Sequence, residues 1–196
     1  MALGWVKNGR HFGEDIAAEF VPSRYPELSK TCDTHIYLNE MTKYSKRIQD
    51  WLQEKNVKAE LLSFEESVHS VEDTMVATGF PVERISKSIV MMTSTANLII
   101  AMVPAENRAS TERVRKFLGL DERPRMATPE EIEMQTGQQV GGNSPFNSPK
   151  ARILIDPKLL EKDWVVTGGG DDKHLVKISI EELKRVIDYT EARVRR

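Results

Sequence analysis

The feature of the sequence that most restricts its fold is a pair of apolar runs at residues 88–93 and 97–103. Both runs are rich in Ile, Val and Met, and the turn-prone tripeptide Ser94-Thr95-Ala96 joins them. Short apolar runs that flank a turn are typical of two paired β-strands. We therefore expect a hairpin in the core, against which helices and further strands must pack.

Helix and strand patterns surround this hairpin without a regular alternation. Ser70 and Asp73 form a capping-box pattern, in which a hydroxyl and a carboxylate satisfy the free amides of a first helical turn. Helices are expected to begin near Thr42, Ser70, Thr111, Thr128 and Ser179, and strands to cover residues 58–64, 152–155, 164–167 and 174–178. The irregular order predicts a mixed α+β domain rather than a doubly wound sheet.

The chain of 196 residues is long enough for one complete core with an appended segment. Residues 1–41 hold several aromatic residues and prolines but no sustained apolar period, which is typical of an accessory segment. Regular helical spacing begins at Thr42. We therefore expect an N-terminal extension at residues 1–41 and one domain at residues 42–196.

Composition excludes several classes of protein. The hydrophobic content of 39% and the charged content of 30% are those of an ordinary globular protein. No apolar run approaches the roughly 20 residues that span a bilayer, and no signal-peptide stretch opens the chain, so we expect a cytoplasmic protein without a membrane partner. A net charge of −2 supplies no general attraction for DNA, and contact with RNA would need a local basic patch.

Neither a disulfide nor a metal site is expected. Cys32 is the only cysteine, and it forms with His35 a C-x-x-H pattern that lacks a second pair of ligands. The sequence Gly168-Gly169-Gly170-Asp171-Asp172 lacks the Lys-Ser/Thr ending of a phosphate-binding loop, so it is interpreted as a hairpin turn. We predict no metal and no cofactor.

The glycine-rich run at residues 141–145, called here the glycine loop, is a candidate for carbonyl chemistry. Gly141 and Gly142 lack Cβ atoms, so a substrate can approach the backbone closely, and backbone amides in such a turn can stabilise negative charge on an oxygen. Pro145 would stiffen the exit of the loop. The alternative is a plain connection between a helix and a strand.

A series of short motifs resembles the YbaK/ProX family of freestanding aminoacyl-tRNA deacylases, which are similar to the editing insertion of bacterial prolyl-tRNA synthetases. The resemblance covers residues 42–190 and rests on His-Ser-Val-Glu-Asp from His69, Ile-Ser-Lys-Ser from Ile85, Thr136-Gly137, the glycine loop and Ile155-Asp156. It implies a mixed, barrel-like β-sheet flanked by helices. It also implies a cleft for the terminal adenosine of a tRNA that carries an esterified amino acid.

The resemblance implies catalytic roles for Lys87, Gly141 and Gly142, and substrate-binding roles for His69, Ser88, Asn143, Ser144, Pro145 and His174. In this family water attacks the ester, assisted by the substrate's own hydroxyl or thiol, so the protein supplies orientation and oxyanion stabilisation. Alternatives stay open: Lys87 as a solvated lysine, His69 as support for a helix start, and His174 as a half-buried strand histidine.

The expected function is therefore trans-editing, the hydrolysis of a small amino acid such as Ala, Cys or Ser from a mischarged tRNA, with tRNA(Pro) as the family analogy. The expected partners are the acceptor end of that tRNA and an aminoacyl-tRNA synthetase. One alternative is a non-catalytic module that binds tRNA or a synthetase through the N-terminal extension. A further alternative is the hydrolysis of another small ester or thioester.

Overall fold

The computed structural model describes residues 41–196. The predicted accessory segment, with Cys32 and His35, lies outside the described residues except for its last position, and its role stays a prediction. Within the described part no helix is long and apolar enough to cross a membrane.

The expected hairpin forms the centre of a five-stranded sheet. Strands β2 (Ser86–Met92) and β3 (Leu98–Pro104) pair antiparallel, and every residue of β3 is buried. Two-residue strands lie at both edges: β4 (Arg125–Met126) pairs with β2, and β8 (Thr190–Glu191) pairs with β5 (Arg152–Ile155). The strand order is β4-β2-β3-β5-β8.

Three further strands form a second, antiparallel sheet in the order β1-β7-β6. Their bounds are Ala59–Ser63 for β1, Trp164–Gly168 for β6 and His174–Ser179 for β7. The two sheets meet where β2 begins: Ile85 forms an isolated bridge with Val166, and Ser86 Oγ donates to the Val166 carbonyl at 2.9 Å. Strand β4 pairs only with Met91 and Met92, and the Ala127 amide donates to the Val90 carbonyl at 3.0 Å, so the edge of β2 is open only before Val90.

The helices begin where side-chain caps predict them. The bounds are α1 Lys43–Glu54, α2 Val71–Thr78, α3 Thr111–Leu118, α4 Pro129–Thr136 and α6 Ile180–Val186. Thr128 and Glu131 form a complete capping box at α4, and Ser110, rather than Thr111, caps α3. The short helices η2 (Val82–Arg84) and α5 (Pro157–Leu160) were not expected, and Asp156 caps α5.

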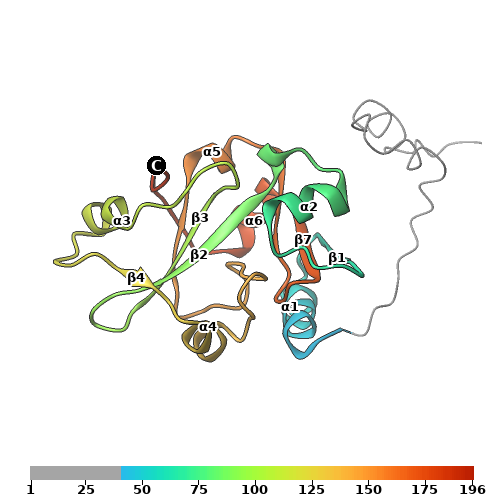
Figure 1. Cartoon of the computed structure of the whole chain (residues 1–196), viewed down its shortest axis with the longest axis horizontal. Coiled ribbons are helices and arrows are strands. Elements are labelled where there is room, and N and C mark those ends of the chain that lie inside the picture. Colours follow the sequence, from blue (N-terminus) through green and yellow to red (C-terminus); the bar gives the residue numbers. More distant parts are fainter. Residues whose placement is uncertain (1–40) are drawn as a thin grey trace, which may run out of the picture. The chain divides into compact units, whose positions relative to one another are not determined.

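The largest hydrophobic cluster joins both sheets to α1 and α6, through residues such as Ile48, Ile100, Met102, Val165, Val176 and Leu183. Figure 1 shows α2 near the start of β2 and α4 near its end. The predicted α+β class, with a mixed sheet system flanked by helices, is confirmed. The open edge of β2 leaves room for a site between the two helices.

Candidate active site

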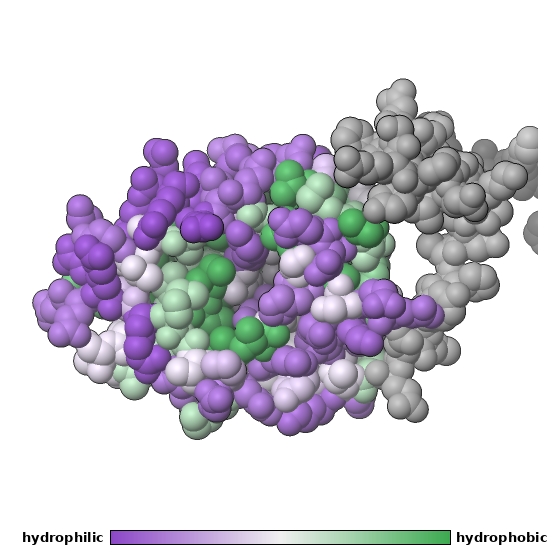
Figure 2. Space-filling view, in the orientation of Figure 1, coloured by the Kyte–Doolittle hydropathy of each residue, from purple (hydrophilic) through white to green (hydrophobic). Residues whose placement is uncertain are grey.

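A cavity of about 340 Å³ lies at the open edge of β2. Its walls come from β2, β6, α2 and the start of α4, and from Val140, Gly141 and Asn143. Figure 2 shows apolar side chains gathered in the hollow over β2; Ile89, Met126 and Val140 are among the lining residues. This size falls at the lower end of the roughly 300–1,000 Å³ that small-molecule sites occupy.

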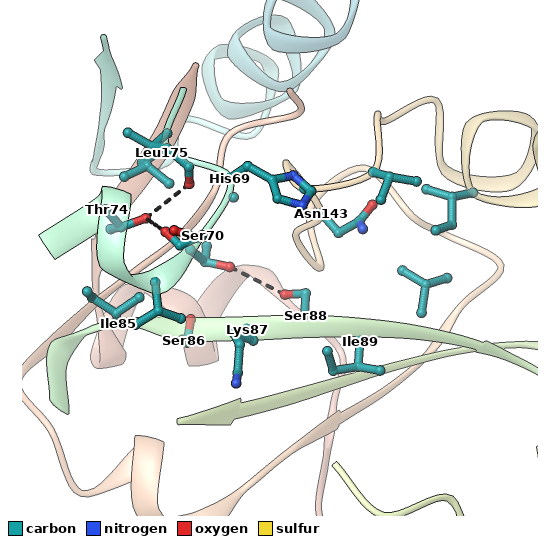
Figure 3. Close-up of a pocket in the computed structure, with 18 of the residues that line it drawn as sticks. His69, Ser70, Thr74, Ile85, Ser86, Lys87, Ser88, Ile89, Asn143 and Leu175 are labelled. Carbon is teal, nitrogen blue, oxygen red and sulfur yellow. Dashed lines mark hydrogen bonds between the residues drawn. The ribbon is translucent and has the colours of Figure 1, made fainter. Parts of the chain in front are cut away.

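Successive residues of β2 face this cavity in different ways. Ser88 is buried, and its Oγ lies 3.3 Å from Thr167 Oγ1 on β6 (Figure 3). The Ile85 carbonyl accepts the Ala105 amide at 2.9 Å, so antiparallel alternation turns the backbone groups of Ser86 and Ser88 away from β3. The open edge of β2 therefore presents both serines to the cavity.

Lys87 is a half-buried residue of β2 that also lines the cavity. Its side chain is on the opposite side of β2 from Ser88 (Figure 3), and it makes no ion pair within residues 41–196. Partial burial lowers the pKa of the Lys87 ammonium, the nearby Arg108 lowers it further, and Glu72 opposes both. An unpaired ammonium at this place is suited to an anionic part of a ligand.

His69 and Gly141 are in direct contact at the wall of the cavity. A Cβ atom on Gly141 would lie 1.9 Å from His69 Nδ1, and the φ of Gly141 is +96°, which favours glycine. Figure 3 shows the His69 ring and the Asn143 side chain on the same side of β2 as Ser88. His69 is thus a lining residue that lies against Gly141, where the positive φ already favours glycine.

Asn143 carries an unused hydrogen-bond acceptor. It lines the cavity, and its Oδ1 is buried without a hydrogen-bond partner among the described residues. Buried polar atoms are nearly always paired, so an unpaired one at a cavity wall indicates a place for a ligand's donor.

The other predicted members of the glycine loop lie behind the cavity. Ser144 is buried, and both its amide and its Oγ donate to Gln138 Oε1, at 2.8 and 3.1 Å. Pro145 is buried as well, and neither residue lines the cavity. The contacts of Ser144 hold the loop from inside, and the structure does not bring these two residues to the cavity.

Gly142, for which a catalytic role was predicted, also lies outside the cavity lining. Its amide donates to the Gln139 carbonyl at 3.1 Å, and the residue does not line the cavity. The amides of Gly141 and Asn143, by contrast, make no hydrogen bond within the described part of the chain. The candidate oxyanion donors are therefore the amides of Gly141 and Asn143. The Gly142 amide is already used, because it donates to the Gln139 carbonyl.

His174 is a buried histidine at the start of β7 and does not line the cavity. Its Nδ1 lies 2.6 Å from Asp171 Oδ1, and its Nε2 is buried without a partner among the described residues. The structure thus places His174 in a strand, more deeply buried than the half-buried position considered above.

Sequence reasoning missed Gln138, Thr167 and Asp171. Gln138 is buried, and its Nε2 donates to the carbonyls of Ser144 and Phe146 at 3.2 and 2.9 Å. No local pattern marks such a residue, because its partners become neighbours only when the loop closes. Among residues 41–196, no group of three His, Cys, Asp or Glu side chains is placed to hold a metal ion.

Asp171 should make the fold sensitive to acid. Burial alone would raise its pKa, but hydrogen bonds from His174, Thr42 and the Lys173 amide hold the pKa at about 2. Since the pKa of an unfolded aspartate is about 3.9, this carboxylate stabilises the fold above pH 4 by roughly 2 kcal/mol, and the contribution is lost as pH falls from about 4 to 2. In urea titrations, the stability difference between wild type and Asp171→Asn should shrink over that range; a constant difference would contradict the assignment.

Comparison with known proteins gives one consistent family. The profile of the aminoacyl-tRNA editing domain matches residues 65–186, more than half of the chain. The proline–tRNA ligase of Solidesulfovibrio magneticus is 28% identical over 126 residues, which cover 64% of this chain and 22% of the ligase. The Bacillus subtilis protein YwhH is 24% identical over 129 residues, which cover 65% of this chain and 81% of YwhH.

Solved structures share the fold. A candidate trans-editing enzyme for prolyl-tRNA synthetase superposes with a TM-score of 0.72 at 24% identity, covering 80% of this chain and 99% of that protein. The hypothetical protein APE2540 gives a TM-score of 0.70 at 22% identity, covering 76% and 99%. The matched region spans only about a fifth of the length of the proline–tRNA ligases, so the similarity concerns one part of them.

Proposed function

Because the chain belongs to the aminoacyl-tRNA editing domain family, we propose that it hydrolyses the ester bond of tRNA charged with a wrong, small amino acid. The family membership agrees with the resemblance predicted from the motifs. For this chain the proposed substrate is tRNA(Pro) that carries Ala, Cys or Ser, because the curated relatives include proline–tRNA ligases. The proposed partners are the acceptor end of that tRNA and prolyl-tRNA synthetase.

The observation that carries this proposal is the convergence of five predicted residues on one cavity. His69, Lys87, Ser88, Gly141 and Asn143 come from segments far apart in the sequence and line the same hollow. Ester hydrolysis needs donors for a developing oxyanion and a place for water, but no protein nucleophile when the substrate supplies its own neighbouring hydroxyl. The amides of Gly141 and Asn143 would meet the first need.

The cavity has both apolar and charged lining residues, which suit different parts of the proposed substrate. Its lining includes the apolar residues Ile89 and Val90 and also the ammonium of Lys87, which feels the charge of Arg108. The amino acid would enter the apolar part, and a phosphate of the terminal nucleotides would pair with Lys87. A cavity of limited volume excludes larger side chains by size but discriminates weakly among Ala, Cys and Ser.

Replacing Lys87 with alanine should reduce deacylation strongly without unfolding the protein. Among the described residues Lys87 is the only lysine that lines the cavity, so its loss should lower kcat/KM for the preferred substrate by about 10²-fold, the usual effect of removing one charge-stabilising group. The measurement is the lifetime of the ester in Ala-, Cys- and Ser-tRNA(Pro) with wild type and variant. Lys184→Ala, which removes an exposed lysine of α6, is the matched control.

Equal ester lifetimes with wild type, Lys87→Ala and no protein would contradict the hydrolase proposal. Retained tRNA binding in that case would favour the non-catalytic module. A chain that begins at Thr42 would then show whether binding depends on the N-terminal extension.

A further inference from the structure

The β6–β7 turn, residues 169–173, lies against the back of the glycine loop although it does not line the cavity. The Gly170 amide donates to the Gly142 carbonyl at 2.9 Å, and the Gln139 amide donates to the Gly170 carbonyl at 2.8 Å. These two backbone hydrogen bonds join the turn directly to the segment that carries the candidate oxyanion donors.

The contact between the two segments is backbone against backbone. A Cβ atom on Gly142 would lie 2.2 Å from the Asp171 amide nitrogen, and one on Gly168 would lie 2.3 Å from the Gly142 oxygen. Glycines at these positions therefore let the main chains touch, so a displacement of the turn is passed to the loop without an intervening flexible side chain.

The Asp171 carboxylate holds the turn in place. It is buried, one oxygen accepts the Lys173 amide at 2.9 Å and lies 2.6 Å from His174 Nδ1, and the other oxygen accepts the hydroxyl of Thr42. Thr42 also caps α1, because its hydroxyl oxygen accepts the amides of Tyr44 and Ser45. One carboxylate thus ties the turn to the start of β7 and to the start of α1.

We propose that Asp171 is a positioning residue for the editing reaction, which fixes the Gly141 and Asn143 amides by clamping the β6–β7 turn against the glycine loop. This inference rests on the proposed function. Oxyanion donors act only when they are held within a fraction of an ångström of the reacting oxygen, and misplacement by about 1 Å can cost 10²-fold in rate. A carboxylate with three donors provides that rigidity.

The kinetic test compares two ways of breaking the clamp in the full chain. Asp171→Asn places an amide NH₂ group against buried donors, and Thr42→Val removes the hydroxyl that Asp171 accepts. With the aminoacyl-tRNA that wild type hydrolyses, both variants should lower kcat at least about tenfold and change KM by less than about threefold. Thr42→Ser should restore most of kcat. Ser110→Ala, which removes the cap of α3, should leave kcat unchanged.

Hydrogen exchange separates this inference from the proposed function. Breaking the clamp should speed the exchange of the hydrogen-bonded amides of Gln139, Gly142, Ser144 and Gly170, while exchange in β3 stays slow. Unchanged exchange in Asp171→Asn would overturn the clamp, and faster exchange with an unchanged kcat would overturn the positioning role. If wild type hydrolyses no aminoacyl-tRNA, the proposed function and with it the positioning role fail, and the exchange measurement still decides whether the clamp exists.

Discussion

Alanine at position 142 is expected to destabilise the protein by about 3 kcal/mol and to remove its hydrolytic activity. The added Cβ would lie 2.2 Å from the Asp171 nitrogen and 2.3 Å from its carbonyl oxygen, which are main-chain atoms that have no rotamer to adopt. Either the β6–β7 turn or the glycine loop must move. Thermal denaturation and ester hydrolysis measured on the same preparation would report both effects.

The control for this variant is Gly119→Ala at the end of α3. Gly119 has a φ of +64°, and a Cβ atom added there would have no neighbour within 4 Å, so only the backbone preference opposes alanine. The expected loss is about 1 kcal/mol, with activity retained. Equal losses of stability in the two variants would show that the close main-chain contact at Gly142 does not add to the cost of the substitution.

Local signals account for the parts of the fold that the sequence predicts well. A hydroxyl before α4 and a carboxylate in its first turn specify that helix start by themselves, because both partners lie within four residues. The β2–β3 hairpin is equally local. The division into two sheets was not predicted, because the bridge between Ile85 and Val166 joins residues that only the tertiary fold brings together.

The same distinction holds within the candidate site. Family motifs identified His69, Ser88 and Asn143, which the structure places around one cavity. The motifs did not show which amides of the glycine loop lack a hydrogen-bond partner. The loop's backbone hydrogen bonds are made with Gln139 and with the β6–β7 turn, and the tertiary fold brings that turn to the loop. For His174, the alternation of side chains along β7 does not predict which face of the sheet the residue occupies, because its neighbours on the strand are buried on both faces.

The cavity also follows from an interruption in strand pairing. Had β4 continued along β2, its backbone would have occupied the edge at Ser86 and Ser88, and the serines would have had no open side. The chain instead leaves this edge between α2 and α4, where the glycine loop closes the remaining wall. The site therefore depends on keeping that loop in one conformation without a regular strand or helix.

Replacing Gln138 with leucine is expected to open the glycine loop. The Gln138 side chain accepts the Ser144 amide at 2.8 Å and donates to the carbonyls of Ser144 and Phe146. Leucine would leave the buried amide and carbonyl of Ser144 without partners and remove the acceptor of the Ser144 hydroxyl, while the Phe146 carbonyl would keep the Ser148 hydroxyl as a donor. Each unpaired group costs about 1–3 kcal/mol, and we expect a total loss of roughly 3 kcal/mol after partial relaxation, with hydrolysis reduced at least as much as in Lys87→Ala.

Gln139→Leu makes the same substitution at the adjacent exposed position and should change stability by less than about 0.5 kcal/mol. Urea denaturation of both variants measures the difference, and a loss below about 1 kcal/mol for Gln138→Leu would mean that solvent or another side chain replaces the glutamine.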